Sequence, residues 1–158
     1  MITKRLILMV GVPGSGKSTF AKYLINSHVA PDEYAYICPD DIREELSGEA
    51  NNQRASEQAW KLTYERLEQK LNVNNTDNVA TQIIFDAVLA NPRTRKRLVN
   101  IARKYKADIV YIIMATPLSR ALERNKSRRR EVSDDVIINF MQRLNNEFPF
   151  ILKDRDEQ

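Results

Sequence analysis

The most specific chemical signature in the sequence is the octapeptide from Gly11 to Ser18. It reads Gly-Val-Pro-Gly-Ser-Gly-Lys-Ser and matches the phosphate-binding pattern of glycine, four residues, glycine, lysine and serine or threonine. Glycines let backbone N–H groups surround phosphate oxygens, because no side chain blocks the approach. An apolar run, Leu6–Val10, leads into the loop, so we expect a strand, a phosphate loop and then a helix.

Two side chains at the end of this loop could complete the phosphate chemistry. Lys17 can reach the terminal phosphates, and the Ser18 hydroxyl can bind Mg²⁺. The helix that should begin at Lys17 adds unpaired N–H groups and the positive end of its dipole. The sequence therefore predicts a nucleoside triphosphate site formed by Gly11, Pro13, Gly14, Ser15, Gly16, Lys17, Ser18 and Thr19.

A second constellation, Asp40-Asp41-Ile42-Arg43, follows the next predicted strand. A carboxylate at the carboxyl end of a parallel strand would lie beside the phosphate loop. There it could take the proton of an attacking hydroxyl. We expect Asp40 to be that base and Asp41 to cap a short helix. The Arg43 guanidinium, three residues beyond Asp40, could grip a phosphate of the acceptor.

Asp86 ends the third apolar run, Ile83–Phe85, and should face the same cleft. Its carboxylate is a candidate Mg²⁺ ligand. It could instead brace Arg43 or the acceptor, or be a plain residue of the turn after the strand.

Positive charge is concentrated in one segment of the chain. From Arg93 to Arg130 there are 13 Lys and Arg against two acids, a net charge of +11, whereas the rest of the chain has a net charge of −7. Such a segment suits an anionic partner or a solvated helix face. We expect Arg124 and Arg128 to close over the phosphates as part of a mobile lid, and Arg129 and Arg130 to be solvated or to contact the acceptor.

The elements that must position these residues alternate between strand and helix. Each predicted helix has an amphipathic stripe or a polar residue and proline at its start, as in Asn91-Pro92 and Thr116-Pro117. Trp60 belongs to such a stripe and suggests core packing rather than function. The predicted strands are Arg5–Val10, Tyr34–Cys38, Thr81–Asp86 and Asp108–Ala115. This order predicts a three-layer α/β fold, with a mainly parallel sheet of four or five strands and helices on both faces.

Composition narrows the class of protein further. The chain has 158 residues and 18.3 kDa, which fits one domain, expected over residues 1–153 with a frayed tail at 154–158. One cysteine and one histidine exclude an intrachain disulfide and a zinc site of Cys and His ligands. The apolar runs are shorter than the roughly 20 residues that a membrane span needs. We therefore expect a cytoplasmic protein with no membrane contact and no obligate protein partner.

Together these segments resemble the kinase domain of phage-type 5′-polynucleotide kinases, a group within the P-loop kinase superfamily. The resemblance extends from about Ile7 to Leu144. It rests on the loop Gly11–Thr19, on Asp40-Asp41-Ile42-Arg43, on Asp86, on Asn91-Pro92-Arg93 and on Arg124-Asn125-Lys126-Ser127-Arg128. The family often has Thr-Asn after the third-strand aspartate, where this chain has Ala87-Val88.

The resemblance implies an ATP- and Mg²⁺-dependent kinase acting on the 5′-hydroxyl ends of DNA or RNA. It implies that Asp40 is the general base, that Arg43 contacts the acceptor phosphate, and that Lys17, Ser18, Arg124 and Arg128 serve the ATP phosphates. The residues alone also allow a kinase of a nucleoside, sugar or antibiotic, or a nucleotide-gated switch protein that only hydrolyses ATP.

Overall fold

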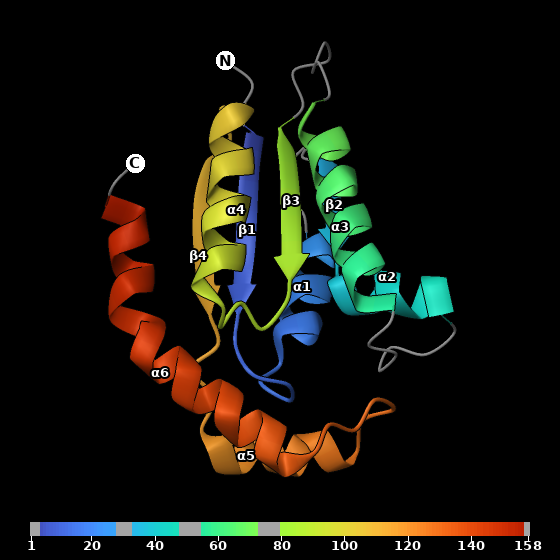
Figure 1. Cartoon of the computed structure of the whole chain (residues 1–158), viewed down its shortest axis with the longest axis vertical. Coiled ribbons are helices and arrows are strands. Elements are labelled where there is room, and N and C mark those ends of the chain that lie inside the picture. Colours follow the sequence, from blue (N-terminus) through green and yellow to red (C-terminus); the bar gives the residue numbers. More distant parts are fainter. Residues whose placement is uncertain (1–3, 28–32, 48–54, 73–79, 157–158) are drawn as a thin grey trace.

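The computed structural model describes residues 4–27, 33–47, 55–72 and 80–156. Within these ranges it has one parallel sheet of four strands, in the order β2-β3-β1-β4 (Figure 1). The strands are β1 (Lys4–Val10), β2 (Glu33–Ile37), β3 (Thr81–Asp86) and β4 (Asp108–Ile113). All four lie within two residues of the predicted ranges.

Helices connect the strands and continue beyond the last one. They are α1 (Lys17–Asn26), α2 (Pro39–Ser47), α3 (Ser56–Leu71), α4 (Pro92–Lys104), α5 (Leu118–Lys126) and α6 (Asp134–Asp156). Helix α6 thus includes the first residues of the predicted tail. In the ranges that the structure describes, no helix is both long and apolar enough to span a membrane.

The register of the sheet aligns the carboxyl ends of its central strands. Met9 of β1 is opposite Asp86 of β3, and Ile37 of β2 is opposite Phe85. The segments that follow β1, β2 and β3 therefore meet at one edge of the sheet. This edge receives the phosphate loop, the start of α2 and Asp86.

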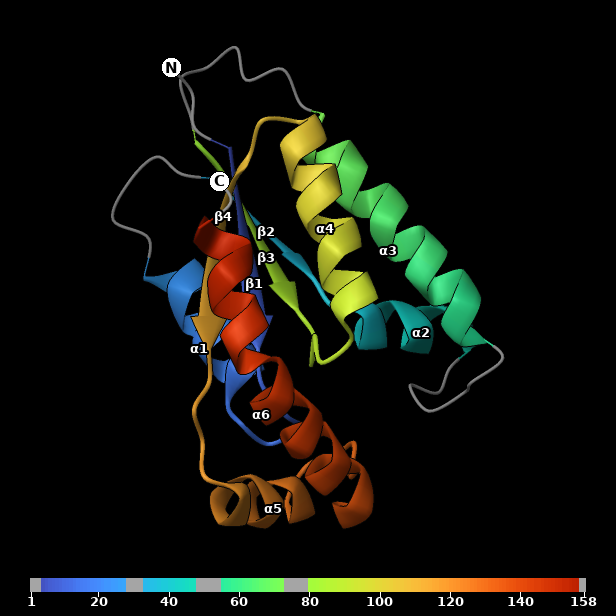
Figure 2. The same ribbon diagram turned by 60° about the vertical axis from the view of Figure 1, so that its left-hand side comes forward.

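Helices cover both faces of the sheet, which confirms the predicted three-layer fold (Figure 2). Alternation along β1 divides the core, because successive side chains point to opposite faces. Leu6 and Leu8 join the cluster beneath α3, α4 and α6, whereas Ile7 and Met9 join the cluster beneath α1.

The starts of two helices test the predicted caps. The Asn91 side chain accepts a hydrogen bond of 2.9 Å from the Arg93 N–H, and Pro92 is the first residue of α4, as predicted. Helix α5 begins at Leu118, and the Thr116 hydroxyl does not cap it. Instead it donates to the Ser15 carbonyl at 2.8 Å, so the segment after β4 is tied to the phosphate loop.

Candidate active site

The loop between β1 and α1 needs glycine for conformation and for space. Gly14 and Gly16 have φ values of +79° and +98°, which side chains rarely adopt. A Cβ atom on Gly14 would lie 2.3 Å from the Ala121 carbonyl oxygen of α5. Any other residue at position 14 would therefore clash with the backbone of the helix that begins the predicted lid.

Lys17 is buried at the start of α1, with only 8% of its surface exposed. Its ammonium donates to the Gly11 and Val12 carbonyls at 2.7 and 3.0 Å. Burial lowers the pKa of Lys17, the negative charge of Asp86 opposes this shift, and the positive charge of Arg128 adds to it. The charges of Asp86 and Arg128 thus both act on the Lys17 ammonium at the point where the loop closes.

Asp86 is the centre of a hydrogen-bonded triad from three elements. Its Oδ2 accepts from the Ser18 hydroxyl at 2.6 Å and from the Tyr36 hydroxyl at 2.7 Å. Burial, followed by the charge of Asp86, raises the pKa of Tyr36, so the phenol stays a proton donor. The triad fixes a nearly buried carboxylate beside the hydroxyl of the first helical turn.

The donor set of this triad suits Mg²⁺. Hard oxygen ligands and few protein groups are typical, because Mg²⁺ keeps waters and phosphate oxygens as its other ligands. Ser18 and Asp86 supply one hydroxyl and one carboxylate. No group of three or more His, Cys, Asp or Glu that could hold a metal occurs among the described residues.

Helix α2 presents its acidic first turn to the same space. The Arg43 guanidinium donates to Asp40 Oδ1 at 2.8 Å, so these two residues do lie together. Asp41 lies inside the first turn of α2 rather than before it, since the helix begins at Pro39. Its carboxylate accepts from Arg130 at 3.0 Å and does not serve as the predicted cap.

The segment after α5 carries the lid arginines and is held by one buried amide. Asn125 is fully buried and bonds both backbone groups of Val132, with Nδ2 to O at 2.6 Å and N to Oδ1 at 3.1 Å. Arg129 pairs with Glu44, and Arg130 pairs with both Asp41 and Glu44. Both arginines therefore contact α2. Arg129 is still 84% exposed, as expected of a solvated side chain, whereas Arg130 is 27% exposed and lines the pocket.

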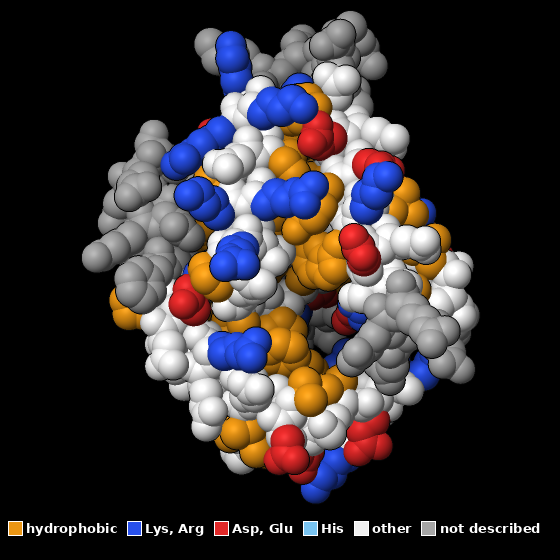
Figure 3. All heavy atoms as spheres, in the orientation of Figure 1, with side chains coloured by type: hydrophobic (Ala, Val, Ile, Leu, Met, Phe, Trp, Pro, Cys, Tyr) orange, Lys and Arg blue, Asp and Glu red, His pale blue; other side chains and the backbone are white. Residues whose placement is uncertain are grey.

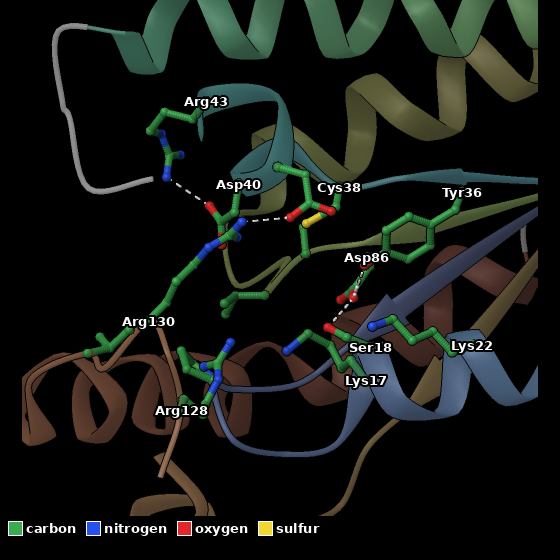
Figure 4. Close-up of a pocket in the computed structure, with 15 residues that line it drawn as sticks. Lys17, Ser18, Lys22, Tyr36, Cys38, Asp40, Arg43, Asp86, Arg128 and Arg130 are labelled. Atoms are coloured by element: carbon green, nitrogen blue, oxygen red, sulfur yellow. Dashed lines mark hydrogen bonds and ion pairs between the residues drawn. The ribbon is translucent and has the colours of Figure 1, made fainter. Parts of the chain in front are cut away.

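One pocket of about 200 Å³ collects most of the predicted site residues. In Figure 4, Lys17 and Arg128 reach into it from one side, while Asp40 and Arg43 lie on the other. Arg124 lies elsewhere, with its guanidinium 3.7 Å from the space that a Gly16 Cβ would occupy, and Thr19 is exposed on the first turn of α1. The predicted residues that line the pocket are Pro13, Lys17, Ser18, Asp40, Arg43, Asp86 and Arg128.

A second cavity of about 620 Å³ adjoins the first and shares Asp40, Arg43 and Asp86 with it. Trp60 and Phe140 line this cavity from α3 and α6, and Ala87–Ala90 lines it after β3. The Trp60 ring stacks 6.3 Å from that of Phe85. Figure 3 shows a hollow rimmed by hydrophobic side chains on this face.

Several residues of the site were not predicted. Tyr36 and Cys38 line the pocket from β2 and the residue after it, and their spacing of two, which points both side chains to one face, could have identified them. Lys22 lies one helical turn after Ser18, which is also a usable signal. Trp60 gave no such signal, because its role depends on a cavity formed by distant segments. Asn125 stands in the motif Arg124-Asn125-Lys126-Ser127-Arg128, but the sequence assigned it no role of its own.

The parallel sheet with helices on both faces, together with the phosphate loop after β1, identifies the fold as that of a P-loop kinase. A family model described as an AAA domain matches residues 6–147, and the chain belongs to this family. The L-seryl-tRNA(Sec) kinase of Methanococcus maripaludis is 27% identical over 143 residues, which are 88% of this chain and 52% of that protein. The chain thus spans about half the length of this curated relative.

Solved structures agree on the fold. A chain of the Pnkp1/Rnl/Hen1 RNA repair complex superposes with a TM-score of 0.74 and 22% identity, over 92% of this chain and 45% of that one. A gluconokinase from Sinorhizobium meliloti superposes with a TM-score of 0.56 and 15% identity, over 90% of this chain and 76% of that one.

Proposed function

We propose that the protein transfers the γ-phosphate of ATP to a hydroxyl at the 5′ end of DNA or RNA, with Mg²⁺. The observation that carries the proposal is the shared pocket, in which a phosphate-loop lysine and a lid arginine face a carboxylate paired with an arginine. A protein that only hydrolysed ATP would have no need for this acceptor side.

On the donor side, the loop N–H groups and Lys17 bind the triphosphate. Ser18 and Asp86 hold Mg²⁺, which neutralises charge on the phosphates when bound. Arg128, and Arg124 beside Gly16, stabilise the charge that develops on the transferred group. These arginines come from the lid, so their contribution depends on its closure over the loop.

On the acceptor side, Asp40 accepts the proton of the attacking hydroxyl. The side chain of Asp40 is 59% exposed, whereas that of Arg43 is 17% exposed. A mostly buried guanidinium thus fixes the orientation of an accessible carboxylate. Arg43 also binds a phosphate of the acceptor by the two-pronged contact that guanidinium groups favour.

Two relatives support a nucleic-acid acceptor. One is named a kinase of a seryl-tRNA, and the other belongs to an RNA repair complex. The net charge of +11 between Arg93 and Arg130 would attract the same class of partner.

The test is transfer of label from γ-labelled ATP to a 5′-OH oligonucleotide, with the same oligonucleotide bearing a 5′-phosphate as the control. We expect labelling of the 5′-OH acceptor only, and loss of labelling when Mg²⁺ is chelated. Absence of label on both DNA and RNA acceptors would refute the proposal.

A small-molecule acceptor is the second candidate, and the cavity beside Asp40 favours it. Its wall after β3 is apolar, because Ala87-Val88 stands where the resembling family often has Thr-Asn. A cavity of about 620 Å³ lies in the range typical of small-ligand sites. Turnover of a nucleoside or sugar that is faster than that of any oligonucleotide, and insensitive to salt, would favour this candidate.

A further inference from the structure

The basic segment Arg93–Arg130 includes helix α4 and the residues that follow α5. The side chains of these two parts have different surroundings. After α5, Arg129 and Arg130 are paired with the acids of α2, and Arg128 lines the pocket. Helix α4 instead carries basic residues and no acid. Its exposed cations are Arg93, Lys96, Arg97, Arg103 and Lys104.

Contacts with α3 orient part of this face without burying it. The Arg97 guanidinium lies 3.9 Å from the centre of the Tyr64 ring, and Lys104 pairs with Glu68 at 2.7 Å. A guanidinium stacked on an aromatic ring keeps its charge and offers its other face to a base or a phosphate.

The face is continuous with the acceptor cavity. Asn91 and Thr94, at the start of α4, line that cavity, and Arg143 of α6 lines it as well. In Figure 3, Lys and Arg side chains form a column over α4 that begins beside the hollow and runs away from it. The C-terminal end of α4 lies at the far end of this column (Figure 1).

We propose that the exposed face of α4 binds the backbone of a single-stranded nucleic acid whose 5′ end enters the cavity beside Asp40. This inference rests on the proposed function and adds the path of the strand. The ten residue-to-residue steps from Arg93 to Arg103 span about 15 Å of helix. At a rise of about 3.4 Å per nucleotide of one strand, this covers four to five nucleotides.

The experiment compares the parent protein with the double variant R93E/K96E in two assays. The first is anisotropy of a labelled 5′-OH single-stranded RNA of about ten nucleotides, and the second is label transfer from ATP to that RNA and to a nucleoside 3′-monophosphate. The control is K61E/K70E, which changes the net charge equally on exposed positions of α3, outside the basic segment.

We expect R93E/K96E to weaken binding of the RNA by about tenfold or more at low salt. The slope of log affinity against log salt should fall by about 1.4, since each lost phosphate contact contributes about 0.7 for a single strand. Transfer to the nucleoside 3′-monophosphate should stay within about twofold of the parent, because neither Arg93 nor Lys96 lines the cavity that holds this acceptor. R93E places an acid in the first turn of α4, where the helix dipole favours negative charge, and Lys96 is exposed, so the melting temperature should be unchanged.

Failure of this inference and failure of the proposed function give different results. If R93E/K96E and K61E/K70E bind the RNA alike, or if the parent does not bind it, the α4 surface is refuted even where transfer occurs. If R93E/K96E alone weakens binding but the parent transfers no phosphate, the proposed function fails and the nucleic-acid surface stands.

Discussion

The two halves of the pocket are built by different means. On the donor side, backbone groups set the site: Lys17 bonds to the nearby Gly11 and Val12 carbonyls, and Gly14 packs against the Ala121 carbonyl of α5. On the acceptor side, side chains orient one another, as Arg43 does for Asp40. Local sequence patterns can therefore specify the loop and the Asp40–Arg43 pair, whereas the walls of the acceptor cavity depend on which distant residues meet.

Substitution of Asp40 by asparagine should have the largest effect and should separate the halves. We expect transfer to a hydroxyl to fall by about 10²- to 10⁴-fold, because a positioned base contributes that much. The affinity for ATP should stay within about twofold, since the donor side is untouched. Label transfer and calorimetric titration with ATP measure the two quantities.

The neighbouring residue supplies the matched control for this substitution. Asp41 is also in the first turn of α2, but its carboxylate pairs with Arg130. Asp41→Asn should therefore retain most of the transfer rate. If Asp41→Asn loses more activity than Asp40→Asn, the base has been assigned to the wrong aspartate.

On the donor side, the hydroxyl of Tyr36 bonds Asp86, so we expect Tyr36 to hold this carboxylate in position. Tyr36→Phe removes that bond but keeps the ring. We expect a loss of about 10- to 100-fold in apparent Mg²⁺ affinity or in activity, the usual effect of removing a group that orients a metal ligand. A titration of activity against Mg²⁺ tests this, and excess Mg²⁺ should restore part of the rate.

Tyr34→Phe is the control, because Tyr34 lies two residues earlier in β2 and the phenol that donates to Asp86 is that of Tyr36. The same Mg²⁺ dependence in both variants would mean that the Tyr36 hydroxyl does not position Asp86.

The contrast between the halves also explains how much the sequence could reveal. The strand–loop–helix around Gly11–Ser18 and the parallel sheet follow from local patterns, and the sheet was predicted closely. The pairing of Arg130 with Asp41 joins residues 89 positions apart, and no local spacing encodes it. Trp60 resembled a core residue because its helical stripe is apolar, yet it also lines a cavity formed by residues of α2, α3, α4, α6 and the segment after β3.

Substitution of Trp60, on the acceptor side, should change the affinity for the acceptor rather than the rate of phosphate transfer. Base–aromatic stacking contributes about 1–3 kcal/mol, so Trp60→Ala should raise the acceptor KM by about 5- to 100-fold. The KM for ATP and kcat at saturating acceptor should change little. Steady-state kinetics with each substrate varied in turn separates these terms.

Trp60→Phe provides the conservative comparison. Because it keeps an aromatic ring in the cavity wall, it should recover most of the acceptor affinity. Equal defects in Trp60→Ala and Trp60→Phe, or a rise in the KM for ATP, would show that Trp60 supports the fold of the pocket rather than contacting the acceptor.

Cys38 lies where the two halves meet, and its substitution should have the smallest effect. Burial raises the pKa of Cys38 to about 11, the Asp41 backbone N–H opposes this, and the charges of Asp86, Asp41 and Asp40 add to it. The thiol is thus protonated at neutral pH and a poor nucleophile. Cys38→Ser should leave transfer within about twofold of the parent.

The raised pKa predicts a pH dependence of stability instead. Above the ordinary thiol pKa of 9.0, the unfolded chain loses a proton that the folded chain keeps, so the free energy of unfolding falls as pH rises from about 9 toward 11. Near pH 10 the loss from this group should be about 1 kcal/mol. Urea unfolding of the parent and Cys38→Ser at pH 8 and at pH 10 should show the additional loss in the parent only, because serine does not ionise in this range. An equal loss in both proteins would mean that other groups titrate and that the Cys38 thiol senses neither half of the pocket.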